Sequence, residues 1–361
     1  MTVSRAMVQT AVRHMEMAHF PVPEAIAPGQ ILLRVEANGV CGSDVSHYAG
    51  SFGAGSDREY PVVRGHEAVG HVAAITPEAV ARWGVATGDR IVVEPVAPCR
   101  RCGRCAREAP ELCERRFVYG RRPIDADGAL WGAFSEYMLV HPGSRVHLIP
   151  DSIPIAEAAL HNALAGGFEW TVRAAGTEPG DDVVILGPGL RGIAGAMAAQ
   201  EAGARNIVMI GRGDPRKAEL ARAFGATHVL DSRTTDIVAS VREICGGGAQ
   251  RIVDLTPHAP WAMNAAIDMA ALGATIVVVG VKGAQVPIAS DQLLHKALTV
   301  RGVNGPGDWG YDRAIETIVA RRRPLHLLHT HRFSLDQADR AITTLEGGGA
   351  DELALGVCVT A

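Results

Sequence analysis

The sequence of 361 residues has no long apolar run, no excess of positive charge and no apolar leader segment. A membrane-spanning helix needs roughly 18 consecutive apolar residues, which the chain does not contain. The 35 Lys and Arg residues are balanced by 39 Asp and Glu residues, so the net charge of −4 favours neither nucleic acid nor a membrane surface as a partner. Residues 1–20 are interrupted by His, Arg and Glu, unlike a signal peptide. We therefore expect a cytoplasmic protein.

Cysteine occurs in a pattern that argues against disulfide bonds. The chain has seven cysteines, an odd number, and four of them lie between positions 99 and 113. A secreted disulfide framework normally uses an even number of cysteines spread along the chain. In a cytoplasmic protein a dense cysteine cluster more often binds a metal ion.

Two parts of the chain differ in their hydrophobic pattern. In the first 150 residues, short β-rich segments separated by Gly, Pro and Asp predict a barrel or sandwich. From about residue 155, a helical stretch precedes apolar strands that alternate with helices, which is typical of a parallel sheet covered on both faces. The expected strands are 31–37, 68–75, 90–93, 137–140, 182–186, 206–210, 228–230, 251–255, 274–279 and 298–303. The expected helices are 154–175, 192–202, 215–224, 237–245, 262–271, 311–322 and 335–346.

A glycine-rich motif follows the first strand of the second part. Gly187, Gly189 and Gly192 fit G-x-G-x-x-G, with Leu190 and Arg191 inside the motif. The motif lies between an expected strand and an expected helix, which is the context in which it binds dinucleotides. Its glycines permit a tight turn and a close approach of the pyrophosphate to the helix N-terminus.

The choice between NAD and NADP is made at the end of the next strand. An acidic residue there would bind the ribose hydroxyls, whereas Gly211 is followed by Arg212, which could meet a 2′-phosphate. Arg216 and Lys217 lie nearby and add positive charge. This pattern favours NADP, while Asp214 keeps NAD open.

The four clustered cysteines have the spacing of a metal site. Cys99, Cys102, Cys105 and Cys113 follow C-x2-C-x2-C-x7-C. Four thiolates within 15 residues can surround one tetrahedral ion, which is the chemistry of a structural zinc site, although iron–sulfur clusters use similar spacings. We expect this zinc to fold a lobe, at about residues 95–115, that has little hydrophobic core of its own.

Two further segments contain candidate ligands. Residues 39–50 read GVCGSDVSHYAG, and residues 64–72 read RGHEAVGHV. Taken in order with the four-cysteine lobe and the GPGLRG loop, they resemble the zinc-dependent medium-chain dehydrogenase/reductase family over nearly the whole chain. The chain is most similar to the alcohol, polyol and threonine dehydrogenase branches of that family, and the resemblance favours zinc over iron and sulfur at the four cysteines.

The resemblance implies a second, catalytic zinc ion. In the family, the residues that correspond to Cys41 and His66 bind this ion, which polarises the oxygen of an alcohol or carbonyl while a nicotinamide exchanges hydride with the substrate. Ser43 corresponds to the family residue that passes on the alcohol proton, and His47 is a weaker candidate for an outer proton relay. Glu67 corresponds to a carboxylate that either binds the zinc or supports it from behind.

The chain departs from the family at one further zinc ligand. Relatives supply a Cys, Asp or Glu at the position where this chain has Asn162, whose neutral amide is a weak ligand. Three outcomes follow: Glu67 completes the site, Asn162 binds weakly, or the catalytic zinc is loose or absent. A site made of Cys41, His66, Glu67 and water keeps the usual charge, and we favour it.

The resemblance also implies the architecture. Residues 1–162 are expected to form a catalytic GroES-like β-barrel-type domain, 163–300 a doubly wound Rossmann domain, and 301–361 to return to the first domain. The implied function is a zinc-dependent NAD(P) alcohol dehydrogenase or carbonyl reductase, acting on a small molecule as a homodimer or homotetramer. Two alternatives remain, a zinc-independent reductase of activated double bonds and a non-catalytic zinc protein that binds nucleotides. Three aromatic residues near these motifs could line the substrate pocket, namely Tyr48, Phe52 and Trp131. For each of them, packing in the core or at an interface is the commoner role.

Overall fold

The computed structural model describes residues 2–51, 60–107, 110–124, 129–347 and 353–361. The chain divides into two compact units. The β-rich unit comprises Met1–Asn162 and Ile315–Ala361, and the parallel-sheet unit comprises Ala163–Ala314. Phe52 lies outside the described residues.

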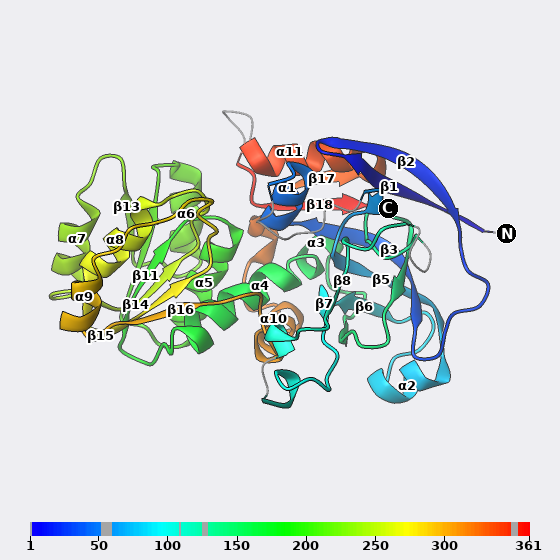
Figure 1. Ribbon diagram of the computed structural model, residues 1–361, viewed down its shortest axis with the longest axis horizontal. Coiled ribbons are helices and arrows are strands. Elements are labelled where there is room, and N and C mark those ends of the chain that lie inside the picture. Colours follow the sequence, from blue (N-terminus) through cyan, green and yellow to red (C-terminus); the bar gives the residue numbers. More distant parts are fainter. Residues whose placement is uncertain (1, 52–59, 108–109, 125–128, 348–352) are drawn as a thin grey trace. The chain divides into compact units, whose positions relative to one another are not determined.

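The β-rich unit is built around an extended sheet (Figure 1). Among the described residues its strand order is β10-β6-β5-β3-β18-β17, and β9 also pairs with β3. The last two strands come from the C-terminal end of the chain, and β18 pairs antiparallel with β3. The strands are β3 (Ile31–Val40), β5 (Glu67–Ile75), β6 (Arg90–Val93), β9 (Tyr137–Val140), β10 (Val146–Leu148), β17 (His329–Ser334) and β18 (Gly356–Thr360).

Smaller elements complete this unit. A second sheet has the order β2-β1-β4, and a short hairpin pairs β7 with β8. These strands are β1 (Val3–Ala11), β2 (His14–Pro21), β4 (Val62–Val63), β7 (Val96–Ala97) and β8 (Phe117–Val118). The helices are α1 (Gly42–Tyr48), α2 (Pro77–Trp83), α3 (Ile155–Ala158) and α11 (Ala338–Gly347). Helix α11 packs its apolar face on β17 and β18, which holds the returning segment in the unit.

The parallel-sheet unit has the strand order β13-β12-β11-β14-β15-β16, with all neighbours parallel. Its strands are β11 (Asp182–Leu186), β12 (Asn206–Gly211), β13 (His228–Asp231), β14 (Ala249–Asp254), β15 (Ala270–Val278) and β16 (Thr299–Gly302). This is the doubly wound order of dinucleotide-binding domains. The predicted α/β fold class is therefore confirmed.

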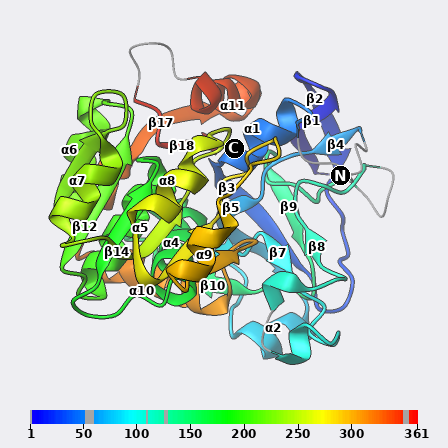
Figure 2. The same ribbon diagram turned by 60° about the vertical axis from the view of Figure 1, so that its left-hand side comes forward.

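Helices cover both faces of this sheet (Figure 2). Ile252 and Ile276 pack against α7 and α8 on one face, whereas their neighbours Val253 and Val277 pack against residues 170–175 on the other. Burial on both faces explains why the strands are continuously apolar. The helices are α5 (Leu190–Glu201), α6 (Pro215–Ala223), α7 (Ile237–Ile244), α8 (Trp261–Met269) and α9 (Ser290–His295).

The expected long helix at 154–175 is divided into α3, α4 (His161–Phe168) and a π-helical segment, Glu169–Ala174. The parallel-sheet unit ends at Ala314, whereas the domain boundary expected from the sequence was residue 300. Residues after β16 stay with the sheet because Trp170 donates a hydrogen bond to the carbonyl of Gly305 and Phe168 packs edge-on against Trp309. Helix α10 (Asp308–Ala320) begins in this segment, and Trp309 is its second residue.

No helix in the described part of the chain is long and apolar enough to cross a membrane.

Candidate metal centres and nucleotide-binding loop

Cys41 lies where β3 ends and α1 begins. It is the N-cap of α1, so its sulfur accepts a hydrogen bond from the Ser43 backbone and its own N–H donates to the Asp44 carboxylate. This reciprocal capping arrangement fixes the first turn of the helix. His66 follows Gly65, whose positive φ of 89° and close contact with the backbone of Phe134 leave no room for a side chain. Backbone geometry therefore positions both candidate ligands.

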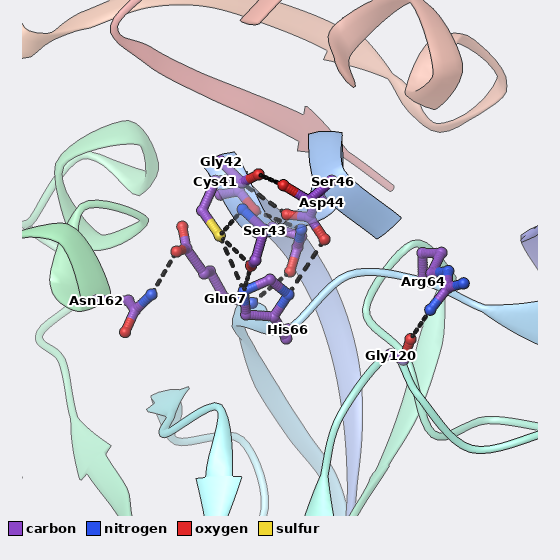
Figure 3. Close-up of polar contacts among 12 residues, drawn as sticks. Cys41, Gly42, Ser43, Asp44, Ser46, Arg64, His66, Glu67, Gly120 and Asn162 are labelled. Atoms are coloured by element: carbon purple, nitrogen blue, oxygen red, sulfur yellow. Dashed lines mark hydrogen bonds and ion pairs between the residues drawn. The ribbon is translucent and has the colours of Figure 1, made fainter. Parts of the chain in front are cut away.

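The side chains of Cys41, Asp44 and His66 form a cluster (Figure 3). Nε2 of His66 lies 3.2 Å from Sγ of Cys41, and Nδ1 lies 3.2 Å from Oδ1 of Asp44. The Ser43 hydroxyl lies 2.6 Å from Sγ and 3.3 Å from Nε2. One imidazole nitrogen thus faces the sulfur while the other is held by a carboxylate.

Electrostatics in this cluster favour a charged imidazole when no metal is bound. Burial of His66 opposes its protonation, but the Asp44 carboxylate and Cys41 outweigh burial and raise the pKa of His66. Burial also opposes ionisation of Asp44, and His66 together with the Cys41 backbone lowers the pKa of that carboxyl group. A divalent cation on Nε2 would take the place of the proton.

The cluster offers two of the ligands that a zinc site requires. Tetrahedral zinc with ordinary Zn–S and Zn–N bonds separates sulfur from nitrogen by about 3.6 Å, close to the separation of 3.2 Å between Cys41 and His66. Asp44 binds the far side of the imidazole, as the outer carboxylate of a histidine–zinc site does. Asp44 was not expected at the site, although an acid three residues after an N-cap is a recognisable signal.

Glu67 and Asn162 bind each other beside the cluster (Figure 3). The Asn162 amide donates a hydrogen bond to Oε1 of Glu67, and both side chains are buried. Gly39 leaves space for Oε2 of Glu67, since a Cβ at that glycine would overlap it. Among the described residues, Glu67 does not belong to the group of Cys41, Asp44 and His66, whose ligand atoms lie within 4.8 Å of one another. Asn162 therefore presents its amide nitrogen to Glu67.

The candidate for the outer proton relay, His47, and two candidates for the substrate-pocket wall, Tyr48 and Trp131, lie in the β-rich unit. Burial, with the charges of Arg121 and Arg64, lowers the pKa of His47 to about 3. His47 therefore stays neutral at physiological pH and accepts a proton only weakly. Tyr48 and Trp131 are packed in two hydrophobic clusters of the β-rich unit, as their commoner structural role predicts.

The four clustered cysteines converge on one point. Their sulfur atoms all lie within 4.8 Å of one another. Cys102 lies 3.6 Å from Cys105 and 3.9 Å from Cys113, sulfur to sulfur, and tetrahedral zinc with four Zn–S bonds requires about 3.8 Å. Backbone N–H groups of Cys105 and Glu114 lower the pKa of Cys102 to about 6, which favours the thiolate that binds metal. The donor set and its spacing fit zinc.

The glycine-rich loop has the geometry for a dinucleotide. Gly187 has a positive φ of 108°, and a Cβ at Gly192 would overlap the carbonyl oxygen of Gly187. Gly189 is the N-cap of α5 and has open space where its Cβ would lie. The loop thus presents the N-terminus of α5 with a backbone that a pyrophosphate can approach. Arg191 within the motif lies over the ring of Trp170, at 5.1 Å, and Leu190 is the first residue of α5.

The end of β12 carries exposed cations. Gly211 ends the strand and Arg212 follows it, exposed to solvent. Asp214 caps α6 by accepting hydrogen bonds from the backbones of Arg216 and Lys217. Arg233, which was not expected, follows β13 and forms an ion pair with Asp231 at 3.2 Å, and these two side chains leave no space for a Cβ at Gly213. Only the parallel pairing of β12 with β13 brings it to this turn.

A doubly wound nucleotide unit, a β-rich unit with a cysteine–histidine cluster and a four-cysteine lobe together define an alcohol-dehydrogenase type of oxidoreductase. The model of the alcohol dehydrogenase GroES-like domain matches residues 27–151, and that of the zinc-binding dehydrogenase matches residues 192–320. The chain belongs to the zinc-dependent medium-chain dehydrogenase family. The predicted family and the prediction of an oxidoreductase are confirmed.

Relatives resemble the chain over nearly its full length. The "Probable alcohol dehydrogenase adh" of Mycobacterium tuberculosis H37Rv is 37% identical over 354 residues, which cover 96% of this chain and 95% of the relative. An erythritol/L-threitol dehydrogenase of Mycolicibacterium smegmatis is 30% identical, covering 89% and 88%. The solved alcohol dehydrogenase of Thermotoga maritima is 26% identical with a TM-score of 0.88, covering 100% of both chains. A candidate zinc-binding dehydrogenase of Sinorhizobium meliloti, solved with NADP, is 26% identical with a TM-score of 0.87 and the same coverage.

Proposed function

We propose that the chain is a zinc-dependent NAD(P) alcohol dehydrogenase or carbonyl reductase. It transfers hydride between a nicotinamide and a small alcohol, ketone or aldehyde. The observation that carries the proposal is the convergence of the Cys41 sulfur and the His66 Nε2 at 3.2 Å, with the Ser43 hydroxyl in hydrogen-bonding distance of both. Bound zinc supplies Lewis-acid polarisation of the substrate oxygen, and the nicotinamide supplies or accepts the hydride.

The residues of the β-rich unit bind the metal and move the proton. Cys41 and His66 would hold the ion, and Asp44 fixes the imidazole so that Nε2 faces the sulfur. During oxidation the Ser43 hydroxyl would accept the alcohol proton while it passes its own proton on toward solvent, and reduction would use the reverse exchange, because this hydroxyl lies within hydrogen-bonding distance of both ligands. His47 is the proposed outer relay, and its low pKa makes any protonated His47 short-lived.

Activity and metal content test this function together. We expect turnover of at least one secondary alcohol, polyol or ketone in a substrate panel with both cofactors, and two zinc ions per chain by elemental analysis. Cys41→Ala should abolish turnover and remove one zinc, while the control Cys245→Ala should change neither. Turnover of activated double bonds that survives Cys41→Ala would instead support the zinc-independent reductase. No turnover with any substrate would support a non-catalytic nucleotide-binding protein.

Glu67 is the proposed third protein ligand of the catalytic zinc. Its buried carboxylate lies against Gly39, two residues before Cys41, and accepts a hydrogen bond from the Asn162 amide that holds it in place (Figure 3). A water molecule would then occupy the open position. If Asn162 bound the zinc instead, its amide oxygen would have to turn toward the cluster and give up this hydrogen bond.

Zinc counting separates these two ligand sets. Glu67→Gln should lower the zinc content from two to about one per chain, because it removes the negative ligand. Asn162→Ala should keep two zinc ions, because it removes only the partner of Glu67. Two zinc ions retained in Glu67→Gln would show that Glu67 is not an essential ligand.

NADP is the proposed cofactor. Exposed Arg212 provides a guanidinium group for a 2′-phosphate, and Arg233 lies nearby in an ion pair with Asp231. The alternative ribose ligand, Asp214, is engaged in capping α6. We expect a lower KM for NADPH than for NADH, and Arg212→Ala should raise the KM for NADPH roughly tenfold through loss of a charged hydrogen bond. Arg222→Ala, on the same helix region, is the control, and a clear preference of the wild type for NADH would reject the proposal.

The proposed assembly is a cytoplasmic homodimer or homotetramer. Strand β16 lies at the edge of the parallel sheet, and Val300 on this strand is 41% exposed. Leu272 and Leu294 on neighbouring elements are 80% and 77% exposed. Exposed apolar side chains at a strand edge favour pairing with a second copy. Light scattering of the wild type should give a multiple of the chain mass of 38.0 kDa, and Val300→Lys should shift it toward one chain.

A further inference from the structure

A buried ion pair lies at the carboxyl edge of the parallel sheet, among residues that the proposed chemistry does not use. Asp254 is the last residue of β14 and its side chain is fully buried. Lys282 comes four residues after the end of β15, and only 10% of its side chain is exposed. Nζ of Lys282 lies 2.7 Å from Oδ2 of Asp254. Each charge depends on the other, because a buried ion that loses its partner is strongly destabilising.

Both members of the pair hold Thr256, in the turn that leaves β14. Oδ1 of Asp254 accepts hydrogen bonds from the Thr256 backbone N–H, at 3.0 Å, and from the Thr256 hydroxyl, at 2.5 Å. Nζ of Lys282 donates to the Thr256 carbonyl at 2.6 Å and lies 3.2 Å from its hydroxyl. Oδ2 of Asp254 meets no hydrogen-bond donor in suitable geometry within the described part of the chain, so the nearby charge of Lys282 is what balances it.

The backbone joins the same two segments. The His258 N–H donates a hydrogen bond of 3.0 Å to the carbonyl of Val281. Gly280 packs so closely on the turn that a Cβ there would overlap the carbonyl oxygen of Thr256. We call residues 254–258 the β14 turn. Its position is therefore set by the segment that follows β15.

The β14 turn contacts the nucleotide loop. Strands β11 and β14 are neighbours, and the chain continues from β11 to β12 in one direction along the sheet and from β14 to β15 in the other. Ligands of doubly wound sheets bind at the carboxyl ends of the strands where this reversal occurs. A Cβ at Gly187, in the loop after β11, would lie 3.3 Å from Cγ2 of Thr256. A shift of the β14 turn would therefore be felt at the nucleotide loop.

We propose that the Asp254–Lys282 pair positions the β14 turn for the nicotinamide half of the nucleotide, a role that rests on the nucleotide binding proposed above. The adenosine ribose is assigned to the end of β12, on one side of β11. A dinucleotide that crosses the nucleotide loop from there reaches β14, on the other side, with its second half.

Lys282 acts through the β14 turn and not on a phosphate group. Three protein oxygens, one from Asp254 and two from Thr256, already surround its ammonium within 3.2 Å. An ammonium has three N–H donors, so this set of oxygens leaves none for a ligand. Lys282 and Asp254 are therefore positioning residues.

Titration of the full-length protein with NADPH and with 2′,5′-ADP, which lacks the nicotinamide half, tests the proposal without requiring turnover. We expect Lys282→Met and Asp254→Asn each to weaken NADPH binding by roughly tenfold and to change 2′,5′-ADP binding by less than about twofold. The double variant should bind NADPH no more weakly than either single variant, because all three break the same pair. If the wild type prefers NADH, NADH and AMP replace the two ligands.

Arg205→Met is the matched control. Arg205 pairs at 2.6 Å with the fully buried carboxylate of Asp182, which begins β11 at the opposite edge of the sheet. Breaking this ion pair should lower stability, as Lys282→Met does, but should leave NADPH affinity unchanged. Hydrogen exchange without nucleotide gives a second readout, since the amides of the β14 turn should exchange faster in Lys282→Met and not in Arg205→Met.

Three results would overturn the proposal. The first is unchanged NADPH affinity in Lys282→Met with folding verified by circular dichroism; if that variant does not fold, the double variant, which leaves no unpaired buried charge, gives the same comparison. The second is an equal loss of affinity for NADPH and 2′,5′-ADP, the sign of a general charge effect. The third is tighter NADPH binding in Asp254→Asn, which would show that a released Lys282 binds phosphate itself. A wild type that binds neither NADPH nor NADH would instead reject the proposed nucleotide binding, and this role with it.

Discussion

At Gly192 a single hydrogen atom, in place of a methyl group, decides whether the nucleotide loop can close. A Cβ at this position would overlap the Gly187 carbonyl, whereas the Cβ position of Gly189 is open. We expect Gly192→Ala to lower the stability of the nucleotide-free protein by about 1–3 kcal/mol through overpacking. Gly189→Ala, the matched control, should leave that stability nearly unchanged. Chemical denaturation of both variants measures the difference, and equal stability would contradict the geometry.

Gly192→Ala is also expected to weaken nucleotide binding by at least roughly tenfold, because the loop must open to relieve the overlap. Fluorescence titration with NADPH measures this effect. An unchanged affinity in Gly192→Ala would show that the loop tolerates the methyl group.

His161 makes stability dependent on pH. The imidazole is fully buried, and burial lowers its pKa to about 4 despite contacts with the carbonyls of Ala158 and Val93. The unfolded chain, with an ordinary histidine pKa of about 6.5, therefore binds this proton more readily than the folded chain does. The neutral His161 therefore contributes fully to the free energy of unfolding above a pH of about 6.5. This contribution, about 3 kcal/mol, is lost as the pH falls toward about 4.

Denaturation midpoints between pH 7 and pH 4 test this expectation. His161→Gln cannot be protonated, so the loss of stability with falling pH should be smaller than in the wild type. Identical pH dependence in the two proteins would show that His161 is not the responsible group.

At the scale of the element, the four-cysteine lobe is held by its ligands more than by its core. Its two short 3-10 helices, Cys105–Arg107 and Pro110–Leu112, contain no fully buried residue. Removing zinc with a chelator should therefore unfold residues 95–115 and expose the Arg-rich lobe to trypsin. Cys105→Ser should have the same effect without a chelator, whereas Cys245→Ser should not. A lobe that resists trypsin after complete removal of zinc would contradict a structural role for the metal.

The elements also show where sequence patterns were sufficient. The apolar strands 182–186 and 206–210 agree with β11 and β12 to within one residue, because a strand buried on both faces has an unbroken apolar sequence. Helix α9 was not expected, because it has only six residues and none of their side chains is buried, so the sequence shows no helical apolar pattern there. The helix expected at 262–271 ends at Met269 because Ala270 already pairs with β14, a long-range contact that no local pattern contains.

At the scale of the whole molecule, the two units are expected to respond separately to nucleotide and to chelator. NADPH at about 100 times its dissociation constant should stabilise the parallel-sheet unit by about 2.7 kcal/mol. Hydrogen exchange should then slow in β11, α5 and β12 and stay unchanged in residues 95–115. Chelation should give the opposite pattern. Uniform changes across both units in either experiment would contradict this independence.

The sequence alone determined the classes of element and the residues with ligand chemistry. Four cysteines spaced within 15 residues, and three glycines between a strand and a helix, are local patterns whose chemistry depends on spacing. The resemblance to the family was carried by such local motifs, and it named Cys41 and His66 together.

Tertiary structure decided the contacts between residues far apart in the chain. It brought Asp44 onto His66, Arg233 beside Gly213, and the Asn162 amide onto Glu67, which lies 95 positions earlier. Each of these pairings depends on strand register and on the packing of separate segments. The local spacing of a motif encodes neither the register nor the packing.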